Sequence, residues 1–117
     1  MKVFFTLAGA NHYYGTDFLK QGMKVLLQKE PDNEYDNEAI LVSIEGLGKI
    51  GYVANSPYTV LGESMSAGRI YDKIGDEATG EVVYVTKQGV LCRVLKKSLT
   101  AKQKVSSVVV NPAQTQL

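Results

Sequence analysis

The amino-acid sequence predicts a mainly β protein, a small, twisted, partly closed barrel of five or six short strands with one or two short helices. Short runs of apolar, β-branched and aromatic residues recur along the chain, and clusters of Gly, Pro, Asn and Asp separate them. Only one segment carries signals for both ends of a helix. A length of 117 residues, with 44% hydrophobic and 21% charged residues, fits one globular domain.

The predicted strands are bounded by residues that do not continue a sheet. The first is an aromatic and apolar run that ends before the loop Asn11–Thr16. Pro31 ends the second because proline has no amide donor for a strand ladder. Gly46 and Gly48 form the turn between the third and fourth strands, and a tight turn at Gly89 joins the last two. The six predicted strands are Lys2–Ala8, Met23–Gln28, Ala39–Glu45, Lys49–Val53, Ala78–Thr86 and Gly89–Lys96.

One helix is predicted, from Ser56 to Ala67. Ser56 is a suitable N-cap, Pro57 suits the first helical position, and Gly68 stands where a C-terminal cap belongs. The helix is expected to pack on the sheet through apolar residues that share one face. These residues are Val60, Leu61 and Met65.

Residues 1–100 are predicted to form the barrel domain. Residues 101–117 are largely polar and are predicted to form a C-terminal tail or a late edge strand. The apolar run Val3–Ala10 is near the lower length limit for a signal peptide, so we interpret it as a retained strand. No apolar stretch approaches the length of a membrane span.

The sequence contains no recognisable active-site motif. A catalytic cysteine needs a base, and the only histidine, His12, belongs to a different segment from Cys92. Cys92 lies in an apolar run and is expected to be a buried, reduced thiol of a cytoplasmic protein. HExxH, CxxC and phosphate-binding glycine-loop motifs are absent. We therefore predict that the protein is not an enzyme and that it binds no metal and no cofactor.

The charge is distributed unevenly between the two halves of the chain. Residues 1–59 carry five Lys or Arg and seven Asp or Glu, giving 5 − 7 = −2, and residues 60–117 carry eight and five, giving 8 − 5 = +3. The resulting net charge of +1 argues against a protein that coats duplex DNA through a broad basic surface. An anionic ligand is therefore expected to touch the second half of the chain as well.

The stretch LLQKEPDNEYDNEAILV joins two predicted strands through a dense polar turn. Its alternating carboxylates resemble the first ligands of a calcium loop, but Asn37 replaces the glycine that such a loop requires. Two alternatives remain. In one, the turn is solvated, and its Asn and Asp side chains cap their own backbone. In the other, Tyr35 and the neighbouring acceptors form the wall of a small-ligand pocket. The alternating carboxylates are Asp32, Glu34 and Asp36.

A second candidate site is the HYYG sequence, residues 12–15. Tyrosine rings in a loop offer platforms on which nucleic-acid bases stack, and Tyr13 is the favoured platform. Tyr14 is interpreted as the ring of the pair that packs against the protein. His12 has no cluster of other ligands, so it is interpreted as a surface histidine that contacts a phosphate or nothing.

Five segments follow one another along the chain: AGANHYY, the G-x-x-V-x-L strand at Gly22 to Leu27, EPDNEYDNEAILV, GKIGYV and the segment after it. This ordered set resembles the HIRAN family over about residues 3–97. The resemblance implies an OB-like β-barrel without catalytic activity. It also implies binding of single-stranded DNA at its free 3′-hydroxyl end. In the family, such domains occur alone in bacteria and at the front of helicases that remodel replication forks.

The resemblance further implies roles for individual residues. Tyr13 would stack on the terminal base, and Tyr14 and His12 would lie near the backbone phosphates. Asn33 and Tyr35 would contact the terminal base and sugar.

Four more positions carry implied roles. Asp36 would accept a hydrogen bond from the 3′-hydroxyl, Tyr52 and Asn55 align with positions that contact the backbone, and Tyr84 would complete the base sandwich. The chain departs from the helicase form, which has arginine at the position of His12 and lysine at that of Asn55. Both differences weaken phosphate binding.

The function expected from the sequence is recognition of single-stranded DNA at free 3′-hydroxyl ends, in DNA repair or at replication forks, with a helicase or nuclease as a further partner. The alternative is a protein-interaction adaptor that uses the same barrel without DNA. No membrane partner is expected.

Overall fold

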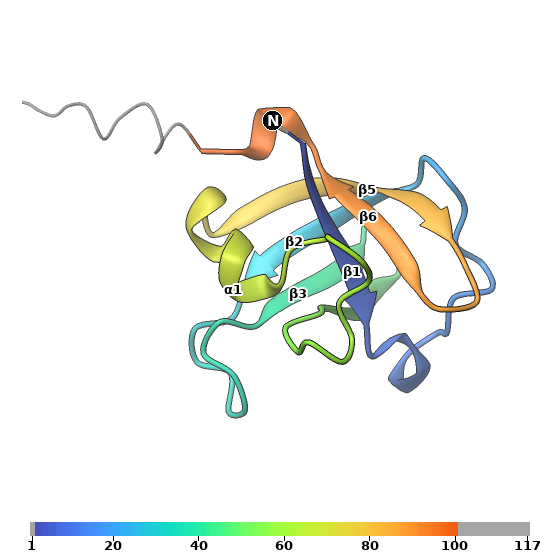
Figure 1. Cartoon of the computed structure of the whole chain (residues 1–117), viewed down its shortest axis with the longest axis horizontal. Helices are drawn as coiled ribbons and strands as arrows, with labels where there is room; N and C mark the ends of the chain where they lie inside the picture. Colours follow the sequence, from blue (N-terminus) through green and yellow to red (C-terminus); the bar gives the residue numbers. More distant parts are fainter. Residues whose placement is uncertain (1, 101–117) are drawn as a thin grey trace, which may run out of the picture.

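The computed structural model describes residues 2–100, and their six strands form a barrel (Figure 1). The strands follow the spatial order β1-β4-β3-β2-β5-β6, all neighbours are antiparallel, and the barrel is closed. Their bounds are β1 Val3–Ala8, β2 Lys24–Lys29, β3 Ile40–Ile44, β4 Gly48–Val53, β5 Glu77–Val85 and β6 Val90–Val94. The predicted mainly β fold and all six strands are confirmed, with ends shifted by at most two residues. The predicted tail or edge strand at 101–117 lies outside the described residues.

β1 closes the barrel because it pairs on both sides. It pairs with β6 from Val3↔Val94 to Leu7↔Val90, and with β4 at only two positions near its end. Two irregularities bend the sheet, one in the β3–β4 ladder and one in the β5–β6 ladder, and such bulges increase local twist. The barrel predicted from the sequence as partly closed is therefore fully closed.

The interior is filled by one face of each strand. The alternating burial along β2 and β6 follows the two-residue period of strand side chains. Cys92 is buried in this core as predicted, and burial raises the pKa of its thiol to about 12. The largest fully buried side chains are Phe5, Leu27, Ile40, Ile50 and Ile70, followed by Val3, Val25, Val42, Val82, Val90 and Val94.

Gly51 allows β1 and β4 to approach each other closely. A Cβ atom at this position would lie 2.5 Å from the carbonyl oxygen of Ala8 and 2.8 Å from Cδ1 of Leu7. No larger residue fits without moving the backbone of β1. The glycine in GKIGYV thus sets the spacing between β1, which precedes the turn that carries Tyr13, and β4, which contains Tyr52.

The predicted helix Ser56–Ala67 is wrong. The segment forms separate turns, and α1 covers only Ala67–Ile70 before continuing as the 3-10 turn η2, Tyr71–Lys73. The helix begins where the prediction ended it. Its N-cap is Ser66, whose hydroxyl accepts a hydrogen bond from the amide of Arg69, and Gly68 lies inside the helix.

Tertiary hydrogen bonds to β1 explain why the segment before α1 is not helical. The hydroxyl of Thr6 accepts a bond from the amide of Leu61 at 3.0 Å and lies 2.8 Å from the hydroxyl of Ser64. The amide of Met65 donates to the carbonyl of Phe4 at 2.7 Å. These bonds use backbone groups that a helix would need for itself, and Met65 packs partly against the core.

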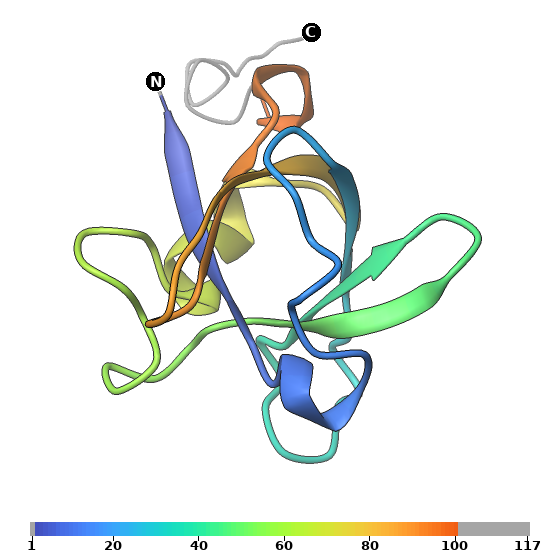
Figure 2. The same ribbon diagram turned by 90° about the vertical axis from the view of Figure 1, so that its right-hand side faces the viewer.

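Three connections meet on one side of the barrel. Figures 1 and 2 show the 3-10 turn η1 (Ala10–His12), the turn after β2 and the segment after β4 all toward the lower side of the molecule. Within residues 2–100, no helix is long and apolar enough to cross a membrane.

Candidate functional site

A cavity of about 540 Å³ opens where these three connections meet. Six of the residues that the sequence singled out line it together: Tyr13, Asn33, Tyr35, Asp36, Tyr52 and Asn55. They come from segments far apart in the sequence, and the closed barrel brings them to one place. The rest of the lining is small or apolar, from Ala8, Ala39, Val53, Ala54, Ser56 and Thr59.

Tyr13 reaches the cavity because the chain turns sharply at the end of β1. Gly9 adopts a positive φ of 74°, and the following turn is held by hydrogen bonds from the amides of Tyr13 and Gly15 to the carbonyl of Ala10. Tyr13 remains 39% exposed and Tyr35, on the opposite turn, 89% exposed. Two tyrosine rings with accessible surface therefore flank the cavity.

Tyr52 contributes a ring whose hydroxyl is already engaged. The hydroxyl donates a hydrogen bond of 2.8 Å to Oε1 of Glu30, and Nδ2 of Asn33 donates to the same oxygen at 3.1 Å. Burial, together with this carboxylate, raises the pKa of Tyr52 to about 12, and the nearby Tyr13 acts in the same direction. Tyr52 is therefore a neutral donor at physiological pH. Glu30 was not singled out from the sequence, where its position before Pro31 was the only signal.

The turn after β2 is built by its own side chains. Oδ1 of Asn33 accepts hydrogen bonds from the amides of Tyr35 and Asp36 at 2.9 and 3.1 Å, and Oδ1 of Asp36 accepts one from the amide of Glu38 at 2.9 Å. The alternative in which the turn caps its own backbone is therefore correct. The same turn also lines the cavity, so capping of its own backbone does not exclude the pocket alternative.

Asp36 is fixed from outside the turn as well. Nδ2 of Asn55 donates a hydrogen bond of 2.8 Å to Oδ2 of Asp36, and Oδ1 of Asn55 accepts one of 2.8 Å from the amide of Gly68. Asn55 thus connects the turn after β2 to α1. Each oxygen of the Asp36 carboxylate has one partner, which leaves acceptor capacity on both.

Three predicted residues lie elsewhere. His12 lines a separate cavity of about 300 Å³ between η1 and the β5–β6 turn. Tyr14 is 57% exposed and meets Phe18 edge to face, with ring centroids 6.5 Å apart. Tyr84 is 60% exposed on β5 and does not line the 540 Å³ cavity. The structure therefore brings together six of the predicted residues and not these three.

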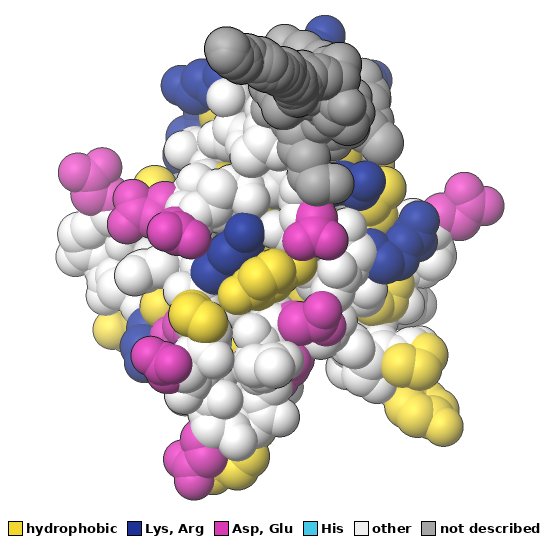
Figure 3. All heavy atoms as spheres, turned by 90° about the vertical axis from the view of Figure 1, so that its left-hand side faces the viewer, with side chains coloured by type: hydrophobic (Ala, Val, Ile, Leu, Met, Phe, Trp, Pro, Cys, Tyr) yellow, Lys and Arg dark blue, Asp and Glu magenta, His cyan; other side chains and the backbone are white. Residues whose placement is uncertain are grey.

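The cavity is poor in positive charge. Among residues 2–100, Asp36 is the one carboxylate that lines it, and neither Lys nor Arg of this range does. Figure 3 shows the side of the molecule that carries α1 and the turn after β2, where Asp and Glu side chains are spread over the surface with Lys and Arg scattered among them. Within the described part of the chain, no group of three or more His, Cys, Asp or Glu could hold a metal ion. From the described residues, the cavity therefore offers aromatic surface and hydrogen-bonding groups.

A small closed antiparallel barrel with an aromatic, hydrogen-bonding cavity at the ends of its strands defines a class of β-barrel binding domain. Within that class, the HIRAN domain family model matches residues 1–109, and the chain belongs to the HIRAN domain family.

Two solved structures are similar in fold. A protein from Lactobacillus plantarum is 27% identical, with 80% of this chain and 93% of that one covered and a TM-score of 0.54. The HIRAN domain of human HLTF is 17% identical, with 95% of this chain and 93% of that one covered and a TM-score of 0.54. No curated protein matches the chain.

Proposed function

We propose that this HIRAN domain is a non-catalytic module that binds single-stranded nucleic acid and recognises its free 3′-hydroxyl end. The observation that supports this most is the meeting of Tyr13, Tyr35, Asn33 and Asp36 in one cavity. Two accessible rings and a pair of polar side chains match what a terminal nucleoside offers, which is an aromatic base and a hydroxylated sugar. Membership of the HIRAN family supports nucleic-acid binding in general.

Stacking supplies affinity that does not depend on base identity. Every base has a π-face, and a base stacked on an aromatic side chain is stabilised by roughly 1–3 kcal/mol. The backbone of Tyr13 is held by the turn that follows β1, so this segment loses little conformational freedom on binding. The exposed Tyr35 can cover the other side of the base.

Asp36 supplies specificity for the chain end. Its carboxylate has free acceptor capacity next to the cavity, so it accepts a hydrogen bond from a 3′-hydroxyl. A 3′-phosphate has no such donor at neutral pH and places negative charge beside the carboxylate. Asp36 therefore discriminates between the two kinds of chain end, because it attracts the 3′-hydroxyl and repels the 3′-phosphate.

The deciding experiment is fluorescence anisotropy with matched oligonucleotides that end in a 3′-hydroxyl or a 3′-phosphate. The 3′-hydroxyl form should bind more tightly, and a label at the 5′ end keeps the two probes equivalent at that end. Equal affinity for the two forms would reject end recognition. A duplex with blunt ends serves as the control for general electrostatic binding.

The biological setting that we propose is DNA repair or the replication fork in the cytoplasm, where the domain would present a 3′ end to a helicase or nuclease partner. The lack of Lys and Arg around the cavity favours one competing function, a protein-interaction adaptor. An adaptor would bind neither oligonucleotide.

A further inference from the structure

A second groove of about 700 Å³ adjoins the cavity. The two share one residue, Asn55, and the groove continues past the turn that begins at Ser56 to the start of α1. Its lining is mostly polar and includes Ser66 and the cation Arg69. The groove also contains one carboxylate, that of Glu63. The groove therefore places Arg69 on the far side of the turn that borders the cavity.

Tyr58 stands on the ridge between the cavity and this groove. Residues on both sides of Tyr58 in the sequence line the two spaces: Ser56 and Thr59 line the cavity, and Pro57 and Val60 line the groove. Tyr58 therefore belongs to the turn that divides them. The side chain of Tyr58 is 96% exposed.

The backbone below this side chain is nevertheless fixed. The amide of Tyr58 donates to the hydroxyl of Ser56 at 3.1 Å, and the amides of Thr59 and Val60 donate to the carbonyl of Ser56 at 2.9 and 3.1 Å. A fully exposed aromatic ring on an ordered turn offers a stacking surface at little entropic cost.

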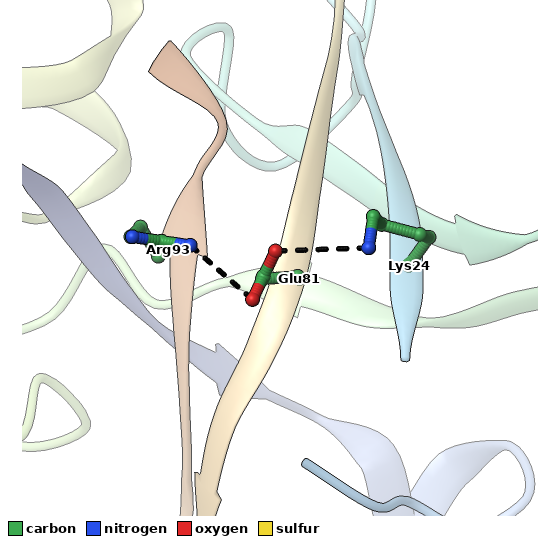
Figure 4. A network of polar contacts seen from close by, with 3 residues as sticks. All are labelled: Lys24, Glu81 and Arg93. Carbon is green, nitrogen blue, oxygen red and sulfur yellow. Dashed lines mark ion pairs between the residues drawn. The ribbon is translucent and has the colours of Figure 1, made fainter. Parts of the chain in front are cut away.

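Arg69 is available for an anion. Among residues 2–100, the ion pairs join Glu81 to Lys24 at 3.7 Å and to Arg93 at 3.3 Å, on the strands β2, β5 and β6 in Figure 4. Arg69 takes part in neither, and its side chain is exposed at the edge of the groove. Glu63 in the same groove opposes an anion, so the guanidinium of Arg69 supplies the attraction that the cavity lacks.

We propose that the nucleic-acid strand leaves the cavity over the turn at Tyr58, with a base upstream of the terminal one stacked on this ring and a backbone phosphate bound to Arg69. The inference rests on the proposed function and extends it from a single terminal nucleotide to a longer single strand. A single strand is the occupant because it offers unpaired bases to an exposed aromatic ring and phosphates to a cation in the adjoining groove.

The experiment compares hexathymidylate, which ends in a free 3′-hydroxyl, with thymidine 5′-monophosphate. Tyr58→Ala should weaken binding of the hexamer by about fivefold or more, the lower end of the stacking range, and should leave binding of the mononucleotide unchanged. Tyr58→Phe should bind the hexamer as the wild type does. Leu47→Ala removes an exposed apolar side chain at the β3–β4 turn and is the matched control.

The role of Arg69 is tested through the dependence of the binding affinity on salt concentration. Arg69→Gln should reduce the slope of log affinity against log salt concentration by about 0.7, the value for one phosphate contact on a single strand. Arg69→Lys keeps the charge and should retain the slope, and Lys49→Gln on β4 is the matched control for the loss of a surface cation.

The outcomes separate this inference from the function on which it rests. If Tyr13→Ala loses hexamer binding while either Tyr58→Ala or Arg69→Gln leaves the hexamer affinity and slope at wild-type values, the path is wrong and the proposed function stands. If the wild-type protein does not bind the hexamer, both are wrong. Thermal unfolding of each variant shows that the fold is retained.

Discussion

Asn55 holds Asp36 in place through a hydrogen bond of 2.8 Å between residues that are 19 positions apart in the sequence. Because the other end of the Asn55 amide accepts from Gly68, the bond links the turn after β2 to α1 through the end of β4. The carboxylate that we propose as the reader of the 3′-hydroxyl is thus oriented before any ligand arrives. Such preorganisation lowers the entropic cost of binding.

Asp36→Asn should lower the affinity for a 3′-hydroxyl end by roughly 1.5–3 kcal/mol, the range for a hydrogen bond to a charged group. Binding to a 3′-phosphate end should fall less or rise, because a repulsion is removed. Fluorescence anisotropy with both probes gives the ratio of affinities. Asp32→Asn, at an exposed carboxylate of the same turn that does not line the cavity, is the control. A folded Asp36→Asn protein with an unchanged ratio would show that Asp36 only stabilises the turn.

Tyr13→Ala should weaken single-strand binding by roughly 1–3 kcal/mol because it removes the stacking surface beside the cavity. Tyr13→Phe keeps the ring and should bind nearly as the wild type does. Titration of a labelled oligonucleotide against both variants measures the difference. Equal losses for the two variants would assign the effect to the hydroxyl of Tyr13 and not to its ring.

The free energy of unfolding should fall as the pH rises from about 9 to about 12. The pKa of Cys92 is raised from 9.0, and that of Tyr52 from 10.0, to about 12 in each case. The folded protein therefore binds these protons more tightly than the unfolded chain does. The stabilisation that the two protonated groups provide is complete below their pKa values in the unfolded chain. It is lost as the pH rises through their pKa values in the folded protein.

Urea denaturation across this pH range measures the effect. Cys92→Ala should flatten the curve from about pH 9 upward, and Tyr52→Phe should flatten it from about pH 10 upward. A slope that is the same in both variants and in the wild type would contradict the assignment. Below about pH 9 the absolute stability of Cys92→Ala is expected to be lower than that of the wild type, since the substitution leaves a small space in the core.

Gly51→Ala should destabilise the domain by roughly 1–3 kcal/mol, the usual cost of forcing extra atoms into a packed site. The new methyl group would lie 2.5 Å from the carbonyl oxygen of Ala8, which is backbone and cannot swing away. Thermal or urea unfolding provides the measurement. Gly48→Ala is the matched control, because Gly48 also has a positive φ, 103°, and no atom would lie within 4 Å of its added Cβ. A loss of the same size in both variants would mean that glycine flexibility, and not the contact with β1, decides the result.

The location of all six strands could be predicted from the sequence because the signals are local. Alternation of apolar and polar residues, Pro31 and the glycine turns each act over a few neighbouring positions. The burial of Cys92 follows from the same pattern. The resemblance to the HIRAN family also named six residues that the structure brings together in one cavity.

The starting residue of the helix between β4 and β5 depends on tertiary structure. Ser56 and Pro57 are good local signals for a helix start, yet hydrogen bonds to Thr6 and Phe4 in β1 draw the segment against the barrel and delay α1 until Ala67. These partners are more than 50 positions away in the sequence, so no local pattern contains them.

The sequence by itself determined the strands, the turns and the identity of the polar and aromatic residues at the strand ends. Only the tertiary structure decided which of those residues meet. Pairing of β2 and β4 on either side of β3 joins Glu30 to Tyr52 and Asp36 to Asn55, while His12, Tyr14 and Tyr84 are directed elsewhere. The physical reason is that strand formation depends on neighbours along the chain, whereas a cavity depends on the register and twist of strands that pair across it.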